Sequence, residues 1–464
     1  MKIAFITLGC KLNFAETATY ERGFRAAGME VVPWREKADI YLINTCTVTE
    51  TSNRKSRGEI RKVHRINPDA QIIVTGCYAQ MKPDEIRAIP GVSRVFLSDE
   101  KAQVVPETLE LSKLPRTNAD RQELPPEGLS TLGQGQGDGA RRRQVVADHA
   151  GHVGRGRSEQ SERSSSGGSY LPASVFGAYS TSERTRAFLK VQDGCDYFCR
   201  YCTIPYARGR SRSIPICEAV KAAEAIAAEG IKEVVITGIN TGDYGRGTGE
   251  SFLDLLKALN EVKGIERWRI SSIEPNLITE EIIDWIASGT KFQPHFHIPL
   301  QQGSDEILAK MGRKYTTAFF ADRIAYIRSK MEGPGKPKVF FGIDVMAGLP
   351  GETEELFQKE IELLEQVRPA FIHIFPYSKR PGTPAAVMPG QVPEQVKAER
   401  VKRLEELCDR LHAEFVEENR GVAEKVLFES KEKDGSMSGY TGNYIRITRP
   451  YDPALVGILS EVII

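Results

Sequence analysis

The sequence predicts an α/β protein with an N-terminal parallel sheet domain, a central partial (βα)6 barrel and a small C-terminal β-barrel. Its 464 residues are too many for one compact domain, because about 150 residues per domain is usual. Apolar runs alternate with helical patterns over most of the chain, which favours parallel strands joined by crossover helices. The expected divisions are 1–114 (sheet domain), 115–180 (linker or insertion), 181–392 (barrel), 393–420 (connecting helix) and 421–464 (β-rich tail).

The charge balance excludes a globally basic nucleic-acid coat protein. There are 63 Lys and Arg against 62 Asp and Glu, for a net charge of +1, so any RNA-binding surface must be local. The chain is 40% hydrophobic and 27% charged, which is typical of a soluble globular protein. The start, MKIAFITLGCKLN, has too short an apolar run for a secretion signal, so we expect a cytoplasmic protein without a membrane partner.

Three dispersed cysteines mark the first domain. Cys10, Cys46 and Cys77 each come just after an apolar run that reads as a strand: KIAFITL, ADIYLINT and AQIIVTG. In open parallel sheets, ligands bind at the edge formed by the carboxyl ends of the strands. We therefore expect the three thiols to meet at one edge and to hold one metal centre.

The segment 115–180 interrupts this pattern. It is rich in glycine and serine, contains the runs QGQGDGARRR and SERSSSGGS, and has almost no apolar periodicity. Such a composition is typical of a disordered tether. Its arginines are offset by acidic residues, so we assign the segment no chemistry.

The central domain has six strand candidates, AFLKV, EVVITG, RWRISSIE, HFHIPLQ, VFFGIDVMAGLP and FIHIFPYS. Their spacing of roughly 32 residues is typical of βα-barrel units, whose reacting groups lie at the carboxyl ends of the strands. Cys195, Cys199 and Cys202 follow the first candidate as C-x3-C-x2-C. Three thiolates at this spacing suit a four-iron cluster with one iron free of protein ligands. A structural zinc site would need a fourth ligand, for which Cys217 is the nearest candidate.

This cysteine motif, with Tyr201 just before its last cysteine, resembles the signature of the radical S-adenosylmethionine enzymes. The segments RISSIEP, HFHIPLQQGSDEILAKMGRKYT and GIDVMAGLPGETEELF resemble the methylthiotransferase branch, and the tail is similar to its TRAM RNA-binding domain. TLGCKLN, NTCTVTETSNRKSR and DGCDYFCRYCTIPYARGRSRS resemble the threonylcarbamoyladenosine tRNA methylthiotransferases. The isopentenyladenosine enzymes read more like YGCQMN, and the ribosomal-protein aspartate enzymes more like LGCPKN.

The resemblance implies two 4Fe-4S clusters and S-adenosylmethionine as cofactors. The catalytic cluster is expected on Cys195, Cys199 and Cys202, and the second on the three N-terminal cysteines. The implied reaction is 2-methylthiolation of N6-threonylcarbamoyladenosine next to the anticodon. Expected partners are tRNA, a reducing electron donor such as flavodoxin or ferredoxin, and a sulfur donor. The alternatives are an enzyme for isopentenyladenosine tRNA or a ribosomal-protein aspartate, and a non-catalytic RNA-binding protein with structural zinc.

Further residues are expected around the cofactor. The resemblance implies that Tyr201 and the strand-end residues Thr237, Gly238, Asn240, Ser272, Glu274 and Gln301 lie near it. Arg208 follows the cysteine loop, where it would bind the cofactor carboxylate or an RNA phosphate, or form part of a solvated basic loop.

Two histidines and four tail residues complete the candidates. One of His295 and His297 is expected to point into the barrel, with a hydrogen-bonded core histidine as the default role. In the tail, Tyr440, Tyr444, Arg446 and Arg449 are candidates for RNA stacking and phosphate contacts. Ordinary strand aromatics with exposed arginines are the alternative.

Overall fold

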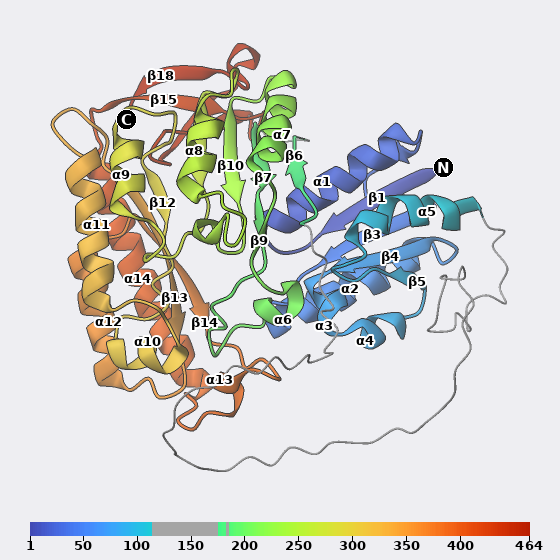
Figure 1. The fold of residues 1–464 in the computed structure, drawn as a ribbon, viewed down its shortest axis with the longest axis horizontal. Coiled ribbons are helices and arrows are strands. Elements are labelled where there is room, and N and C mark those ends of the chain that lie inside the picture. The colour runs from blue at the N-terminus through green and yellow to red at the C-terminus, as the bar shows by residue number, and fades with distance from the viewer. Residues whose placement is uncertain (114–174, 182–184) are drawn as a thin grey trace, which may run out of the picture. The chain divides into compact units, whose positions relative to one another are not determined.

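The computed structural model describes residues 1–113, 175–181 and 185–464 (Figure 1). Most of the predicted linker therefore lies outside the described residues. Its last part does not follow the prediction, because Ala178–Ser180 form a strand, β6, that pairs antiparallel with the first barrel strand. A strand of three residues is too short to leave a periodic pattern in the sequence.

The N-terminal domain is a five-stranded parallel sheet, as predicted. Its strands are β1 (Lys2–Thr7), β2 (Glu30–Val31), β3 (Ile40–Thr45), β4 (Gln71–Gly76) and β5 (Val92–Val95), in the order β2-β1-β3-β4-β5. Two helices, α1 (Lys11–Ala26) and α5 (Val104–Lys113), share a core with one face of the sheet. The helices α2 (Glu50–Ile66), α3 (Cys77–Met81) and α4 (Pro83–Arg87) share a core with the other face.

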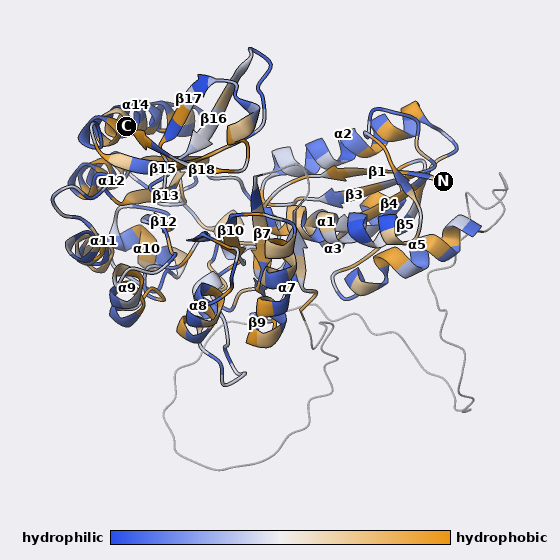
Figure 2. Ribbon diagram, turned by 90° about the horizontal axis from the view of Figure 1, so that it is seen from above, coloured by the Kyte–Doolittle hydropathy of each residue, from blue (hydrophilic) through white to orange (hydrophobic). Residues whose placement is uncertain are grey.

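The apolar pattern explains these layers. Every residue of β3 is buried, as expected for a central parallel strand covered on both faces. On α1, Tyr20 and Phe24 are one helical turn apart and pack against Ile3 and Leu42. The strands of this domain are accordingly among the most hydrophobic parts of the ribbon (Figure 2).

The central domain contains the six predicted parallel strands. They are β7 (Arg186–Lys190), β10 (Glu233–Thr237), β11 (Arg267–Ile270), β12 (His295–His297), β13 (Phe340–Ala347) and β14 (Phe371–Pro376). Isolated bridges from Trp268 to Phe292 and from Ser272 to His297 connect the two ladders. The strands thus follow one another as a partial barrel, with β7 bordered by β6 at one edge.

Helices surround this curved sheet (Figure 1). They are α7 (Ile216–Ala228), α8 (Phe252–Asn260), α9 (Glu280–Ala287), α10 (Asp305–Met311), α11 (Thr317–Met331), α12 (Glu354–Val367) and α14 (Glu394–Glu418). The last of these was expected to be only a connecting helix. Instead its Leu404, Leu407 and Leu411 are buried in the barrel core, and the β14 amide of Ile372 donates to Cys408 Sγ at 3.2 Å. It therefore packs against the barrel as one of its outer helices.

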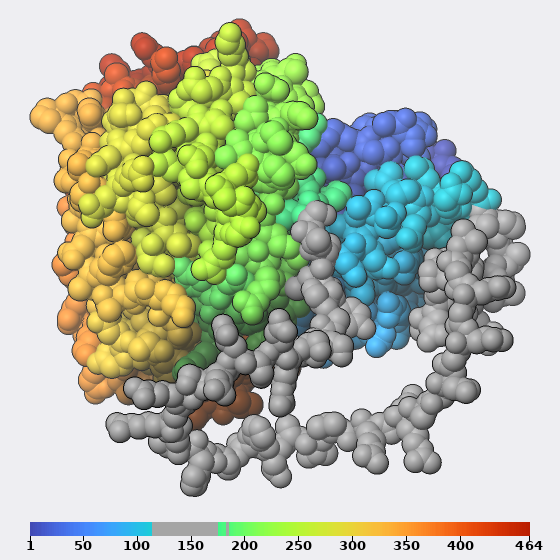
Figure 3. Space-filling view, in the orientation of Figure 1, coloured from blue at the N-terminus to red at the C-terminus, as the bar shows by residue number. Residues whose placement is uncertain are grey.

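The tail forms a four-stranded antiparallel sheet. Its strands are β15 (Ala423–Phe428), β16 (Ser436–Tyr440), β17 (Arg446–Pro450) and β18 (Leu459–Ile463), in the order β17-β16-β15-β18. No ladder joins the two outer strands within the described tail, so the predicted small barrel is a partial one. In Figure 3 these red residues border the green and yellow barrel along its upper edge. None of the described helices is long and apolar enough to cross a membrane.

Candidate active site

The N-terminal cysteine site consists of Cys10, Cys46 and Cys77. These residues directly follow or lie close behind the carboxyl ends of β1, β3 and β4, which are neighbours in the sheet. Cys46 and Cys77 are buried and Cys10 is exposed. The charge of Cys10 raises the pKa of both buried thiols, and the charge of Cys46 also raises the pKa of Cys77. The expected convergence of the three residues is therefore present.

Two glycines shape this site. Gly9 and Gly76 precede Cys10 and Cys77 and have φ angles of +102° and +100°, which side-chain-bearing residues rarely adopt. A Cβ atom on Gly76 would lie 2.4 Å from the Thr45 carbonyl oxygen, and one on Gly9 would lie 3.0 Å from Cys46 Sγ. Glycine is therefore required where the chain turns from strand to cysteine.

Arg208 lies against this site and not where it was expected. It is 1% exposed, and its Nε donates to Cys77 Sγ at 3.1 Å. Its other nitrogens donate to Asn13 Oδ1 at 2.6 Å, to Asp193 at 2.9 Å and to Glu16 at 3.2 Å. The predicted contact with a cofactor carboxylate or an RNA phosphate is wrong, because the guanidinium faces the chain's own anions and Cys77.

Arg208 belongs to a buried charge network with Glu16 and Lys101 of the N-terminal domain and Lys190 and Asp193 of the barrel. Lys190 Nζ lies 2.7 Å from both carboxylates, and Lys101 Nζ lies 2.8 Å from Glu16. Burial alone would raise the pKa of Glu16, but Lys101, Lys190 and Arg208 hold it far below its ordinary value. The network holds three cations and two anions, so the excess positive charge lies beside Cys77.

The barrel cysteine site consists of Cys195, Cys199 and Cys202 in the loop after β8 (Gln192–Asp193). Each sulfur accepts a hydrogen bond: Cys195 from the Tyr197 amide at 3.5 Å, and Cys202 from the Ile204 amide at 3.4 Å. Cys199 accepts from the Arg313 guanidinium at 3.1 Å. Burial raises the pKa of both Cys195 and Cys202 to about 12 in the metal-free chain, so a metal must displace protons from these thiols.

Arg313 is a site residue that the sequence did not reveal. Besides Cys199, it donates to the Tyr201 hydroxyl at 3.3 Å and forms an ion pair with Glu274. Both Tyr201 and Glu274 were expected near the cofactor, and the structure brings them together through this arginine. Burial raises the pKa of Glu274 even though Arg313 opposes the shift. A lone arginine in a loop carries no spacing signal, which is why it was missed.

The strand-end residues lie around the same loop. Thr237 and Asn240 are buried, and the Asn240 amide donates to Gln192 Oε1 at 3.0 Å. A Cβ on Gly238 would lie 2.7 Å from the same oxygen. The Asn240 side chain has neither its nitrogen nor its oxygen hydrogen-bonded to any described residue. A buried amide without partners is costly, so this side chain is suited to bind a ligand.

Ser272 and Gln301 are placed by their backbones. The Ser272 carbonyl accepts from the Thr241 hydroxyl, and the Gln301 amide donates to the Asp344 carbonyl at 2.7 Å. Gln301 has a φ of +70°, a conformation that is strained for this residue type and is found mostly at functional sites. No side-chain role follows for either residue from these contacts.

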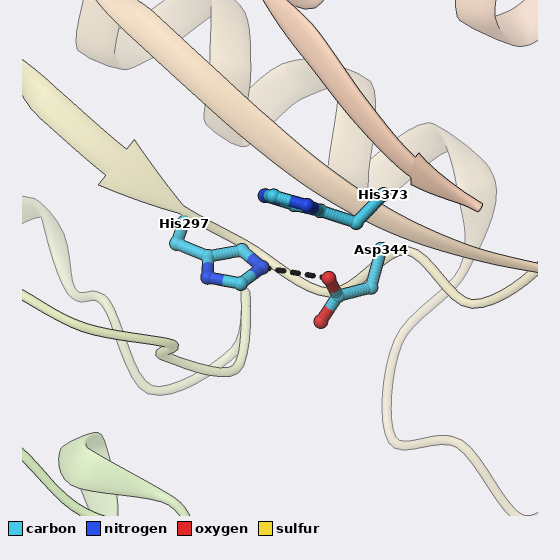
Figure 4. Close-up of side chains that lie close together, drawn as sticks. All are labelled: His297, Asp344 and His373. Atoms are coloured by element: carbon cyan, nitrogen blue, oxygen red, sulfur yellow. Dashed lines mark hydrogen bonds and ion pairs between the residues drawn. The ribbon is translucent and has the colours of Figure 1, made fainter. Parts of the chain in front are cut away.

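The barrel lumen is the inward face that carries His297, Asp344 and His373 (Figure 4). His297 Nε2 lies 2.7 Å from Asp344 Oδ1, and the two imidazole rings are 4.9 Å apart. A Cβ on Gly342 would lie 3.6 Å from His373 Nε2, so the missing side chain leaves room for the rings. His295 also faces inward, because residues two apart on a strand share a face, and the expectation that only one of the pair does so is wrong.

The floor of the lumen is made by the tail. Tyr444 packs its ring 4.8 Å from that of His295, accepts a hydrogen bond from Arg186 at 3.0 Å, and has the Arg269 guanidinium 4.9 Å from its centroid. Tyr440 stacks on it at 4.6 Å. Neither tyrosine is free to stack on RNA, so for them the alternative of structural aromatics holds. Arg446 and Arg449 are exposed.

Lys11 is the second residue that sequence reasoning missed. It begins α1 directly after Cys10, and burial lowers its pKa to about 8. Its charge interacts with those of Arg186, Arg269 and Asp344, all on barrel strands.

The geometry disfavours single-ion cysteine sites. The ligand atoms of His297, Asp344 and His373 all lie within 4.8 Å of one another. No other group of three or more His, Cys, Asp or Glu side chains among the described residues is this close together. The sulfur atoms of neither cysteine triplet are this close together. The four ligand atoms around one zinc ion, in contrast, lie at about this distance from one another. Cys217, the suggested fourth ligand, lies exposed on α7. Three thiols held further apart fit a larger iron-sulfur cluster better.

Comparisons with known proteins agree with this architecture. Residues 2–98 match an uncharacterized protein family, UPF0004, and residues 189–364 match the radical SAM superfamily. The threonylcarbamoyladenosine tRNA methylthiotransferase MtaB of Bacillus subtilis is 38% identical, over 99% of this chain and 93% of that protein. The protein of the same name from Aquifex aeolicus is 36% identical, over 97% of each chain.

Two further relatives widen the picture. The tRNA-2-methylthio-N(6)-dimethylallyladenosine synthase of Carboxydothermus hydrogenoformans is 31% identical, over 98% of this chain and 95% of that protein. Among solved structures, the radical S-adenosylmethionine methyltransferase TsrM of Kitasatospora setae aligns with a TM-score of 0.53 at 17% identity, covering 83% of this chain and 74% of that one. That likeness concerns the fold alone. By its full-length relatives and its two cysteine sites, the chain belongs to the radical S-adenosylmethionine methylthiotransferase family.

Proposed function

We propose that this protein attaches a methylthio group to C2 of N6-threonylcarbamoyladenosine next to the anticodon of tRNA. The observation that carries the proposal is the pair of three-cysteine sites in one folded unit, connected through the buried charge network. The substrate follows the relatives with 38% and 36% identity, whose names specify threonylcarbamoyladenosine. A tRNA substrate is also consistent with a cytoplasmic location.

The residues fit the two implied 4Fe-4S clusters and S-adenosylmethionine. Each triplet offers three thiols, which leaves one iron of a four-iron cluster open to another ligand. The unpartnered Asn240 amide and the Gly238 backbone lie at the end of β10, where a cofactor can approach closely. When bound, the barrel cluster would supply one-electron reduction of S-adenosylmethionine, and the N-terminal cluster would supply sulfur.

The chain's own residues would position these groups. Arg313 would hold Cys199, Tyr201 and Glu274 in one arrangement, and its positive charge would favour an anionic cluster. Arg208 would act in the same way on Cys77. Because Arg208 also bonds Asp193 of the barrel, the separation of the two cysteine sites would be fixed by side chains rather than by the connecting chain.

RNA binding is proposed for the tail sheet. Its candidates are now Arg446 and Arg449 on the exposed strand β17, without the two tyrosines. Arg446 pairs with Glu432 at 2.8 Å, and a phosphate would have to compete with that carboxylate. We propose that removing residues after Gly421 lowers tRNA affinity, as a TRAM-like module implies. The electron donor and the sulfur donor are proposed by class only.

Iron and sulfide content after anaerobic reconstitution tests the two-cluster proposal. Wild type should hold about eight irons, and the Cys10/Cys46/Cys77→Ala and Cys195/Cys199/Cys202→Ala variants about four each. About four irons in wild type, unchanged in the first variant, would rule out a second cluster. A colourless protein containing zinc would instead support the non-catalytic RNA-binding alternative.

A product assay tests the substrate. The reconstituted enzyme is supplied with S-adenosylmethionine, a reductant and tRNA that carries either threonylcarbamoyladenosine or dimethylallyladenosine. Mass spectrometry of the nucleosides should then detect the methylthio product of the first only. The second candidate, favoured by the 31% identical dimethylallyladenosine relative, predicts the reverse.

A further inference from the structure

We propose that the exposed side of helix α2 in the N-terminal domain binds backbone phosphates of the tRNA substrate. This inference rests on the proposed function, because it assigns a second RNA-binding surface besides the tail sheet. The surface consists of Arg54, Lys55, Arg61 and Arg65, and we call it the α2 basic face.

Helix α2 carries a large excess of positive charge. Its segment ETSNRKSRGEIRKVHRI contains six Lys and Arg residues against two Glu residues. The whole chain, in contrast, has a net charge of only +1. Positive charge is therefore concentrated on this one helix, as a local anion-binding surface requires.

Four of these six cations have no acidic partner. Arg57 pairs with Glu50 at 3.2 Å and with Glu85 at 2.9 Å. Lys62 pairs with Glu59 at 3.8 Å. The side chains of the α2 basic face, however, are exposed and form no hydrogen bond or ion pair with any described residue. Their donors are therefore available to a ligand.

Helix α14 provides a comparison within the same chain. It has five Lys and Arg residues, and each of them forms an ion pair with a Glu residue. The pairs are Lys397–Glu394, Arg400–Glu352, Lys402–Glu406, Arg403–Glu354 and Arg410–Glu365. Helix α2 instead keeps like charges close together, for example Arg61 and Arg65 one turn apart, which is unfavourable in the free helix. A bound anion would remove this repulsion.

The spacing of the cations suits a chain of phosphates. Arg54, Arg61 and Arg65 are seven and four residues apart, so they lie on one stripe of the helix. This stripe is about 16 Å long, because an α-helix rises about 1.5 Å per residue. Phosphates along one strand of a nucleic-acid helix are about 3.4 Å apart along its axis. The stripe therefore spans about five successive phosphates.

An open hollow lies along the C-terminal part of the stripe. Its volume is about 320 Å³, and it is lined by Gly58, Arg61, His64, Arg65 and Pro90. A Cβ atom on Gly58 would meet no atom within 4 Å, so no side chain fills the space between the arginines. Guanidinium groups bind phosphate oxygens through paired hydrogen bonds. The hollow thus offers two unpaired guanidiniums to one phosphate.

RNA suits this surface better than a membrane does. A helix that binds a membrane surface needs an apolar face that enters the lipid. The apolar residues Ile60 and Val63 of α2 are instead buried in the core of the N-terminal domain. The helix is also connected to the N-terminal cysteine site, because the Ser56 hydroxyl donates to the Cys46 carbonyl at 3.5 Å. An RNA bound along α2 would therefore extend from that site.

The salt dependence of tRNA binding tests the proposal. The reconstituted full-length enzyme is titrated into fluorescently labelled tRNA that carries threonylcarbamoyladenosine, and anisotropy gives the Kd at several salt concentrations. Each phosphate contact adds about 0.7–0.9 to the slope of log Kd against the logarithm of the salt concentration. Arg61/Arg65→Gln should therefore lower this slope by about 1.4–1.8 and weaken binding at about 0.1 M salt by roughly 25- to 60-fold.

A second variant and a control locate the effect. Arg54/Lys55→Gln, at the other end of the stripe, should lower the slope by a similar amount. Lys402/Arg410→Gln removes two exposed positive charges from α14 and should change the slope by less than about 0.3. The iron content and the Tm of each variant are measured, so that a folding defect is recognised.

Three results would overturn the proposal, and a fourth concerns the function on which it rests. An unchanged slope in both α2 variants would show that this face does not bind phosphates. An equal decrease in the α14 control would show that only the net charge of the chain matters. Binding to phosphatidylserine vesicles that both α2 variants lose, with tRNA binding retained, would assign the face to a membrane. Wild type that binds the tRNA but forms no methylthio product would overturn the proposed function and not the α2 basic face.

Discussion

Removing the charge of Glu16 should loosen the contact between the N-terminal domain and the barrel. Glu16 is fully buried and lies within 2.8 Å of Lys101 and 2.7 Å of Lys190, and its third partner, Arg208, is at 3.2 Å. Glu16→Gln keeps the size of the side chain but leaves three buried cations with one anion. Lys101→Met, in contrast, leaves two cations and two anions, so its effect should be smaller.

The expected magnitudes follow from this charge balance. Breaking a buried ion pair from one side costs about 3–5 kcal/mol, which corresponds to a roughly 150- to 5,000-fold larger population of the locally opened state. Losing the Lys101 hydrogen bond costs about 1.5–3 kcal/mol, or roughly 10- to 150-fold. The surface pair of Glu21 with Arg25 on the same helix is worth only about 0.3–0.5 kcal/mol.

Hydrogen exchange measured by mass spectrometry reports the opening of individual segments. It is therefore suited to a chain that is too long for two-state unfolding. Peptides from α1 and from the β7 region should exchange faster in Glu16→Gln by the factor given above, and in Lys101→Met by less. Glu21→Gln serves as the control and should change the rate by no more than about twofold. Equal rates in Glu16→Gln and Glu21→Gln, or a larger effect of Lys101→Met, would refute the charge-balance reasoning.

Three further changes have defined outcomes. Gly76→Ala should remove about four of eight irons, because its Cβ would collide with the Thr45 carbonyl oxygen, 2.4 Å away; full iron content would contradict this. In the metal-free protein, the rate at which Cys195 and Cys202 are alkylated should rise about tenfold per pH unit from pH 7 to 10, because their pKa of about 12 keeps the thiolate scarce. A plateau of this rate near pH 9 would count against the prediction. Tyr444→Ala should cost about 3–5 kcal/mol, seen as a lower Tm in a thermal melt, whereas Tyr444→Phe should cost about 1 kcal/mol.

The parts of the fold that follow from apolar periodicity were predictable. The six barrel strands and the parallel N-terminal sheet contain long apolar runs, and a run of this kind reports burial directly. The position of Cys10, Cys46 and Cys77 at one edge followed as well, because parallel neighbours end on the same side. Their role as ligands remains a prediction that metal analysis must test.

The contacts between residues far apart in the sequence were not predictable. Arg208, Arg313 and Lys11 each act on a group more than a hundred residues away in the chain, and no local spacing encodes such a contact. Tyr444 was interpreted as a possible RNA contact because it is an aromatic residue in a β-rich tail. Only the packing of that tail under the barrel reveals that the ring meets His295 instead.

The tail has one consequence beyond packing. Tyr444 forms the floor of the lumen, and Arg446, two residues later, begins the exposed strand β17. Only Ile445 separates the ring that forms the floor from the start of the exposed strand. A ligand on β17 that moved Tyr444 would change the affinity for a ligand in the lumen, and because coupling free energies are reciprocal, each ligand would alter the affinity for the other by the same factor.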